Sequence, residues 1–203
     1  MKLEYFYHRH ANLLVENDIY FKSDYDELIS CLNSISDSDL IEEFNKSKSK
    51  RINIKSLSEP INNILKHKLT YLGWVSESSL FKEPPYNQGN RSRWRLDFAK
   101  NKISIEVAFN HQEATAHNIM KPVLASELNH VKKDIQTEMG VIIVATEKLK
   151  KAGNFDSAIG TFEKFQEYFK PYNNLITVPI VLIGICEPDT FIIDKNSKEI
   201  KFY

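Results

Sequence analysis

Hydrophobic and polar residues alternate in two short runs near the middle of the chain. In residues 95–98 and again in residues 103–109, every second position is apolar, which is the period of two that β-strands show. Residues 99–102, with the sequence AKNK, separate the two runs and have the composition of a turn. The pattern therefore predicts a β-hairpin around which the rest of the chain is organised.

The predicted hairpin brings two carboxylates onto one face. With Lys100 and Asn101 at its tip, Asp97 would lie opposite Ser104 and diagonal to Glu106. Diagonal neighbours lie roughly 7–8 Å apart at their Cα atoms, close enough for both acids to bind one cation. The odd-numbered apolar residues of the second strand would face the core. The alternative is a pair of solvated acids, which many surface hairpins carry.

Other segments show helical or buried-strand patterns. Apolar positions spaced by three and four predict helices over residues 23–35, 40–44, 58–72, 112–137 and 161–170. Continuous apolar runs predict strands covered on both faces over residues 141–145 and 178–186. A further hairpin is expected over residues 190–203.

The helix predicted over residues 112–137 contains a proline. Pro122 should kink it, and its buried stripe would consist of Leu124, Leu128, Val131 and Ile135. A hairpin followed by helix, strand, helix and strand predicts an α/β fold with a mixed central β-sheet flanked by helices. At 203 residues with 42% hydrophobic residues, the chain can bury a core, and we expect a single domain over residues 1–203.

Charge narrows the functional classes. Basic and acidic residues balance at 27 each, which argues against a protein held to nucleic acid by bulk charge but allows a local basic groove. Cations beside a carboxylate pair suit a phosphodiester substrate. Five basic residues surround Asp97 in the sequence: Arg91, Arg93, Arg95, Lys100 and Lys102. The basic segment 46–51 is predicted as a loop, either solvated or in contact with a DNA backbone.

The sequence lacks the motifs of several other classes of protein. Cys31 and Cys186 match no zinc-binding spacing and read as two reduced thiols. Residues 1–10 are too charged for a signal peptide, and the longest apolar run, 178–186, is too short to span a bilayer. We therefore expect a cytoplasmic protein without a membrane partner. A small-molecule enzyme is disfavoured because the sequence has no phosphate-cradling glycine loop, nucleophile elbow or HExxH motif.

The predicted hairpin also resembles a known active site. The run LDFAKNKISIEVAF, residues 96–109, is similar to the active-site hairpin of the BglII/BstYI group of type II restriction endonucleases, a branch of the PD-(D/E)xK nuclease fold. Residues 59–74 resemble that family's helix ending in a Gly-Trp pair, and residues 178–185 resemble its late buried strand. The similarity covers about residues 50–186, in the family's order.

The resemblance implies a type II restriction endonuclease that hydrolyses phosphodiester bonds of double-stranded DNA at a short palindromic sequence. It implies Mg²⁺ as the cofactor, held by Asp97, Glu106 and the main-chain carbonyl of Val107. A homodimer formed through helical parts of residues 112–137 is expected, because two-fold related subunits match a palindrome. A cognate DNA methyltransferase is the implied partner in the same system.

One position departs from the family pattern. Two residues after the glutamate, the nuclease fold has lysine and the BglII/BstYI group has glutamine, whereas this chain has Ala108. A methyl group can neither orient water nor contact a phosphate. Either the protein binds DNA without cutting it, or a nearby residue fills the missing role; the candidates are Asn110, His111, Gln112 and Lys121.

The resemblance also implies further site residues. An upstream acid, Glu59 or Glu77, could join the metal site. The DNA would be contacted by three groups of residues: Arg91, Arg93 and Arg95; Asn110, His111 and Gln112; and Asn154, Asp156 and Ser157. Amides suit adenine and a carboxylate suits the amino group of cytosine, although residues 153–157 also have the composition of an ordinary turn. A repair or junction nuclease of the same fold is the remaining enzymatic alternative.

Overall fold

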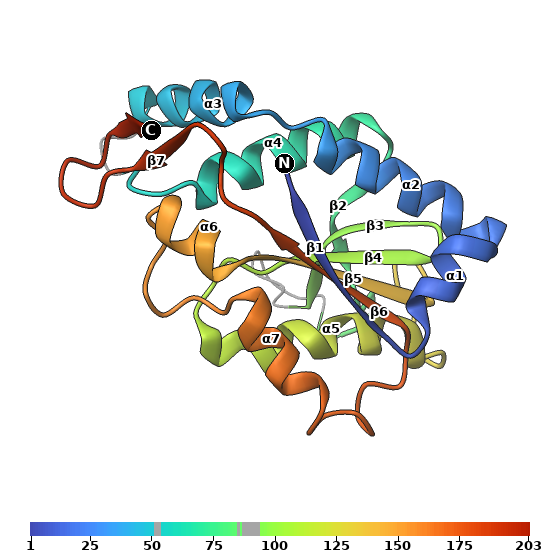
Figure 1. The fold of residues 1–203 in the computed structure, drawn as a ribbon. Coiled ribbons are helices and arrows are strands. Elements are labelled where there is room, and N and C mark those ends of the chain that lie inside the picture. Colours follow the sequence, from blue (N-terminus) through green and yellow to red (C-terminus); the bar gives the residue numbers. More distant parts are fainter. Residues whose placement is uncertain (51–53, 85, 87–93) are drawn as a thin grey trace.

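The computed structural model describes residues 1–50, 54–84, 86 and 94–203. A mixed six-stranded sheet, in the order β1-β6-β5-β4-β3-β2, forms its centre (Figure 1). The strands are β1 (Leu3–His8), β2 (Val75–Ser79), β3 (Arg95–Lys100), β4 (Ile103–Val107), β5 (Met139–Ala145) and β6 (Ile180–Ile185). A separate two-stranded sheet contains β7 (Phe191–Ile193) and β8 (Ile200–Phe202). The predicted α/β class and the terminal hairpin are confirmed.

Helices cover both faces of the large sheet. In Figure 1, α2, α3 and α4 lie above it, and α5 and α7 lie below it. The helices are α1 (Ala11–Asn17), α2 (Ile19–Asn33), α3 (Asp37–Lys50), α4 (Ser58–Tyr71), the 3₁₀ helix η1 (Gln112–Ala114), α5 (Thr115–Glu127), α6 (Glu147–Ala152) and α7 (Phe162–Phe169). One apolar cluster joins Ile105 and Val141 to the upper helices, and another joins Ile142 to α5 and α7. Successive residues of the central strands therefore pack into two different hydrophobic cores, one on each face of the sheet.

Strands β5 and β6 are buried along their whole length, as their continuous apolar sequences predict. They run parallel to each other, and β5 also runs parallel to β4. The carboxyl ends of these three strands consequently meet at one edge of the sheet. The segments that follow β4 and β5 carry the predicted site residues.

The central hairpin is present, but its predicted register is wrong. Strands β3 and β4 pair through Phe98–Ile105, Ala99–Ser104 and Lys100–Ile103, so the turn lies one position later than expected. Asp97 is therefore not opposite Ser104. Because the register shifts by two residues, each side chain keeps the face that the alternation predicts.

Contacts with α2 explain where the turn lies. The Nζ atom of Lys100 lies 2.7 Å from Oε1 of Glu27, and the side-chain amide of Asn101 donates a hydrogen bond of 2.8 Å to Asp24. Asn101 also has a φ of 47°, a left-handed conformation that asparagine tolerates better than most residues. These partners are 73 and 77 positions away in the chain, so the sequence of the hairpin alone does not reveal them.

The helix predicted over residues 112–137 is wrong in its extent and in its buried stripe. Helix α5 ends at Glu127, and Pro122 lies inside it. Its buried apolar residues are Ile119, Val123 and Ala125, whereas Leu124 is only partly buried. The other three stripe residues lie beyond the helix and pack, partly buried, against a small cluster: Leu128, Val131 and Ile135.

Side chains from the following loop satisfy the carboxyl end of α5. The amide of Gln136 donates to the carbonyl of Ser126 at 2.8 Å, and the Nζ atom of Lys133 donates to the carbonyl of Ala125 at 2.7 Å. The last carbonyls of a helix lack intrahelical partners, so these contacts stabilise a helix end that apolar spacing does not mark.

Two helices on the upper face are longer than predicted. Helix α2 begins at Ile19, and α3 extends from Asp37 through Lys50, so the basic segment is helical up to Lys50 and not a loop. Acidic residues in the first turn of α3 and lysines in its last turn complement the helix dipole. Arg51 lies outside the described residues.

The predictions for α4 and α7 are confirmed. Helix α4 is followed by Gly73 with a φ of 85°, the left-handed conformation that ends many helices. Phe162, Phe165 and Phe169 of α7 are buried. Within the described ranges, no helix is long and apolar enough to cross a membrane.

Candidate active site

Three acidic residues come from three adjacent strands at one end of the sheet. Strand β2 pairs with β3 on both sides of Glu77, through Ser76–Phe98 and Ser78–Leu96, and this register places Glu77 opposite Asp97. The pairing of β3 with β4 ends at Phe98–Ile105, and the same register continued by one residue places Asp97 beside Glu106. The hairpin therefore brings the two predicted carboxylates closer together than the expected register would.

Asp97 is held by the neighbouring strand. One of its carboxylate oxygens, Oδ2, accepts a hydrogen bond of 2.6 Å from the main-chain N–H of Val107. Burial raises the pKa of Asp97 above its usual value, and this hydrogen bond and the nearby Lys121 oppose the rise. The negative charge of Glu77 adds to it. A carboxylate in such surroundings gains from a nearby cation.

Glu106 is almost completely buried, with 2% of its surface exposed. Burial raises its pKa to about 8, and the charge of Asp97 adds to the rise. The Oε2 atom of Glu106 forms an ion pair of 2.7 Å with Nζ of Lys121. The other oxygen, Oε1, is buried and has no hydrogen-bond partner in the described part of the chain.

Lys121 reaches the site from α5, on the face of the sheet away from α4. Its side chain is 14% exposed, and it occupies the space beside Glu106 into which the strand itself sends only a buried methyl group, that of Ala108. The sequence names Lys121 as one of several candidates for the missing role. The structure places its ammonium group within hydrogen-bond distance of Glu106.

The donor set suits a hard cation. Asp97 and Glu106 supply carboxylate oxygens, and the unpartnered Oε1 of Glu106 has an unused capacity to accept or ligate. No group of three His, Cys, Asp or Glu side chains is gathered closely enough to bind a metal within the described residues. Mg²⁺ commonly takes one or two protein carboxylates and fills its remaining positions with water and substrate phosphate. The residues present therefore fit Mg²⁺ better than a metal that needs a closed protein cage.

A pocket of about 250 Å³ opens beside Asp97. Asp97, Glu77 and Val107 line it from the strands, and Asn62, Asn63 and Lys66 line it from α4. Of the two upstream acids that the sequence leaves open, Glu77 lines this pocket and Glu59 does not. The sequence pattern does not mark these three α4 residues as site residues. The only signal is the spacing of four between Asn62 and Lys66 on the polar face of the helix.

The segment after β4 lies against the loop that precedes α7. His111 forms an isolated antiparallel bridge with Ile159, and the main-chain N–H of Gln112 donates to the carbonyl of Ala158 at 2.7 Å. Asn110 accepts a hydrogen bond of 2.8 Å from the side-chain amide of Asn118. The two segments implied to read bases are therefore neighbours in space, and Asn110, His111 and Gln112 are exposed.

Residues in the second of these segments differ in their surroundings. Asn154 has a φ of 50°, and its side-chain amide donates a hydrogen bond of 2.6 Å to the carbonyl of Lys55. Asp156 is exposed and accepts a turn hydrogen bond of 2.8 Å from the N–H of Ala158. Ser157 is also exposed. The amide nitrogen of Asn154 is thus engaged within the protein, whereas Asp156 and Ser157 face solvent.

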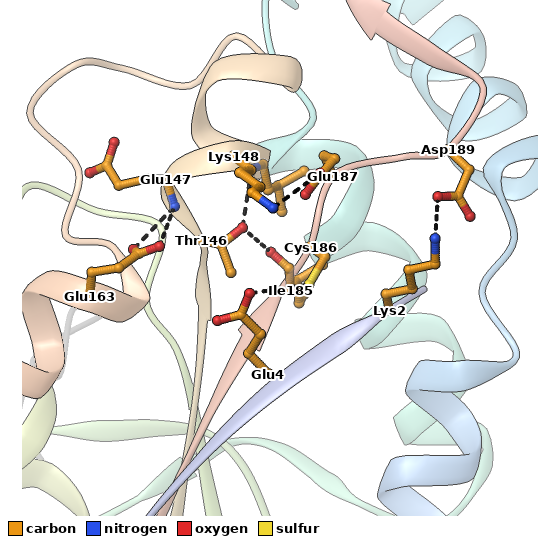
Figure 2. A network of polar contacts seen from close by, with 11 residues as sticks. Lys2, Glu4, Thr146, Glu147, Lys148, Glu163, Ile185, Cys186, Glu187 and Asp189 are labelled. Carbon is orange, nitrogen blue, oxygen red and sulfur yellow. Dashed lines mark hydrogen bonds and ion pairs between the residues drawn. The ribbon is translucent and has the colours of Figure 1, made fainter.

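Figure 2 shows how α6 is fixed at the carboxyl ends of β5 and β6. Thr146 caps α6, because its hydroxyl accepts from the N–H of Leu149 and donates to the carbonyl of Ile185 at 3.0 Å. The N–H of Glu147 donates to both carboxylate oxygens of Glu163, each at 3.1 Å. Glu163 belongs to α7, so this network holds both helices that flank the loop of residues 153–161.

The basic cluster expected around Asp97 is only partly assembled. Lys100 points to α2 and pairs with Glu27, and Lys102 pairs with Glu138 on the surface, so the expectation that these two lysines surround Asp97 is wrong. Both lysines lie at the tip of the hairpin, where Glu27 and Glu138 are their partners. Arg95 lies 3.9 Å from Glu77 and stays at the site. Arg91 and Arg93 lie outside the described residues.

Comparisons with known proteins show the family to which the chain belongs. A family model described as the restriction endonuclease BglII/BglIII matches residues 3–185. The chain belongs to this family. It is a type II restriction endonuclease, an enzyme that hydrolyses DNA at specific sites. A sequence search of curated proteins finds no match.

Two solved structures of BglII share the fold of this family member. The crystal structure of BglII complexed with a DNA 16-mer superposes with a TM-score of 0.63 at 18% identity, covering 99% of this chain and 87% of that one. Free BglII superposes with a TM-score of 0.57 at 18% identity, covering 95% and 83%. The family resemblance of the hairpin sequence is therefore confirmed over nearly the whole chain of this endonuclease.

Proposed function

We propose that the endonuclease cleaves a short palindromic sequence in double-stranded DNA with Mg²⁺, and that Asp97, Glu106 and Lys121 form its active centre. The ion pair between Lys121 and the buried Glu106, directly beside Asp97, carries this proposal. It supplies the positive group that Ala108 cannot. The reading in which the protein binds DNA without cutting it rested on that missing group.

In this proposal Asp97, Glu106 and the main-chain carbonyl of Val107 hold the metal, with Glu77 as an added carboxylate at the edge of the site. When bound, Mg²⁺ neutralises charge on the scissile phosphate and acidifies a water molecule. The protein itself contributes position: the hydrogen bond from Val107 fixes Asp97, and burial keeps bulk water away from Glu106.

Lys121 would act on the substrate side of Glu106. Its Nζ atom donates to Glu106 in the free protein, and an ammonium group has three donors. It can therefore keep one hydrogen bond to Glu106 while directing another at a phosphate oxygen or at the attacking water. Because α5 supplies the group, the strand position two residues after Glu106 is free to be a small apolar residue.

Residues at the carboxyl edge of the sheet would contact the DNA bases. Asn110, His111 and Gln112 are exposed beside the loop that carries Asp156 and Ser157. Asn154 would position that loop, since its amide binds the carbonyl of Lys55. Arg91, Arg93 and Arg95 would contact the backbone. We assign Asn110 and His111 to binding, because Lys121 already supplies a group beside Glu106.

We further propose a homodimer that acts in the cytoplasm, with a cognate methyltransferase protecting the host's own sites. Each subunit would be one endonuclease domain over residues 1–203. Two-fold symmetry lets each subunit cut one strand of a palindrome. Light scattering of the protein bound to a cleavable duplex should give two protein chains of 23.6 kDa each; one chain per duplex would contradict the dimer.

The direct test is digestion of unmethylated phage DNA with the purified protein, with Mg²⁺ and with EDTA. Discrete fragments that appear only with Mg²⁺ are expected. Asp97→Ala and Glu106→Ala should each slow cleavage by about a thousandfold or more, because several kcal/mol of charge stabilisation are lost. A smear would instead indicate a repair-type nuclease, and intact DNA with a clean binding shift would indicate a DNA-binding protein without activity.

A further inference from the structure

Helix α4 presents two unpaired polar side chains to the pocket beside Asp97. Asn62 and Lys66 are separated by four residues and so lie on one face of the helix. Both line the pocket and both are exposed. Neither forms a hydrogen bond or an ion pair with another described residue.

Their neighbours on α4 are engaged in contacts within the protein. The amide of Asn63 donates to Glu43 at 3.1 Å and to Ser47 at 3.3 Å, and Nζ of Lys68 donates to the hydroxyl of Ser34 at 3.2 Å. Asn63, which also lines the pocket, and Lys68 therefore have donors engaged within the protein. Asn62 and Lys66 keep their donors available.

The charges that line the pocket indicate which kind of ligand it can bind. Lys66 is the one cation that lines it among the described residues, and it shares the pocket with the carboxylates Asp97 and Glu77. A metal ion alone would be repelled by the ammonium group, and a free anion alone would be repelled by the acids. A phosphodiester satisfies both sides, since its oxygens accept from an ammonium and an amide while its metal-bound side faces the carboxylates.

Lys121 and Lys66 approach the centre from opposite layers. Figure 1 shows α4 above the sheet and α5 below it, and the acids lie at the end of the sheet between them. A DNA strand that reaches Asp97 and Glu106 at this end therefore passes α4 on one side.

We propose that Asn62 and Lys66 form a phosphate-binding subsite that holds the cleaved strand, at the backbone phosphate next to the scissile one, against Asp97. The proposal rests on the proposed nuclease function. Lys66 supplies the charge, and Asn62 supplies directional donors one helical turn away. Their contribution is to substrate binding, not to the chemical step.

The experiment measures DNA affinity and cleavage for matched variants. The probe is a fluorescent duplex that spans a cut site mapped from wild-type digests, and its Kd is followed by anisotropy over a range of salt concentrations. Lys66→Ala should weaken binding about tenfold and lower the slope of log Kd against log salt by about 0.9, the value for one lost phosphate contact. For Lys66→Ala, KM should rise while kcat stays within about threefold of the wild-type value. Asn62→Ala should lose less affinity than Lys66→Ala and keep the wild-type salt slope. Lys66→Arg should restore the wild-type salt slope.

Lys68→Ala is the control, because this lysine lies on the same helix but outside the pocket and donates to Ser34 within the protein. It should match wild-type affinity and salt slope. The inference is overturned, with the proposed function intact, if wild type cuts the DNA and Lys66→Ala keeps the wild-type slope and KM. It is also overturned if Lys66→Ala lowers kcat with KM unchanged. A wild-type protein that neither cuts nor binds DNA would overturn the proposed function and this subsite together.

Discussion

The two carboxylate oxygens of Glu106 have different surroundings. Oε2 is paired with Lys121, and Oε1 is buried without a partner among the described residues. A buried acceptor without a partner costs stability, so the site is arranged for something other than the stability of the free protein. A hard cation is the ligand that would satisfy Oε1, and such local conflicts are expected where a protein binds its substrate.

His8 provides a test of the structure away from the active centre. Burial lowers its pKa below the ordinary value of 6.5, the charge of Arg9 lowers it further, and a hydrogen bond with the carbonyl of Ile176 opposes this. Below pH 6.5 the unfolded chain therefore binds more protons at this residue than the folded protein does, so the contribution of His8 to stability falls as the pH decreases.

We predict that the urea midpoint of the wild-type protein falls relative to that of His8→Gln as the pH is lowered from 7.5 to about 5. His8→Gln keeps a donor for Ile176 but cannot titrate, and comparing the two proteins cancels the contributions of Asp97 and Glu106, whose raised pKa values act in the opposite direction. A constant difference between the two midpoints would show that the pKa of His8 is not lowered in the folded state.

At the scale of elements, the tip of the hairpin and α2 are held together by charge. Lys100 contacts Glu27 at 2.7 Å and Asp24 at 3.6 Å, and Asp24 is buried. We predict that Lys100→Ala lowers the free energy of unfolding by about 1–3 kcal/mol, because it leaves a buried carboxylate without its cation. Lys102→Ala, which breaks an exposed pair with Glu138, should cost clearly less, because solvent screens that pair. Chemical denaturation measures both, and equal effects would contradict the importance of the α2 contact.

Close contact between α5 and β5 depends on Gly140. A Cβ atom there would lie 2.4 Å from Cβ of Pro122, and the proline ring cannot rotate away. Gly140→Ala should therefore displace α5, cost about 1–3 kcal/mol in unfolding free energy, and slow DNA cleavage, because Lys121 is adjacent to Pro122. Gly73→Ala should cost about 1 kcal/mol through its positive φ with cleavage unchanged. Full activity in Gly140→Ala at normal stability would contradict this account.

The elements differ in how far the sequence reveals them. The alternation in residues 95–109 predicts the hairpin, since period and face depend only on neighbouring residues. The position of its turn depends on Asp24 and Glu27, and the end of α5 depends on Gln136 and Lys133. Contacts between distant residues determine those boundaries, and a local pattern does not contain them.

At the scale of the whole molecule, the proposed active centre combines residues that lie far apart in the chain. Asp97 and Glu106 are predicted from one hairpin, and the pairing of β3 with β4 brings them side by side. Lys121 could be named only as one of several candidates, because its approach from α5 depends on how the helix packs on the sheet. Asn62 and Lys66 were missed, since their place beside Asp97 depends on how α4 packs above it.

The most direct test of the active centre is the single-turnover rate of cleavage by Lys121→Ala with saturating Mg²⁺ and DNA. Lys22→Ala, which removes an exposed lysine of α2 paired with Asp26, serves as the matched control. The account predicts a fall of about a hundredfold to a thousandfold for Lys121→Ala, as for loss of one charge-stabilising donor, and a wild-type rate for Lys22→Ala. A folded Lys121→Ala protein that cuts at the wild-type rate would show that another residue fills the position left by Ala108.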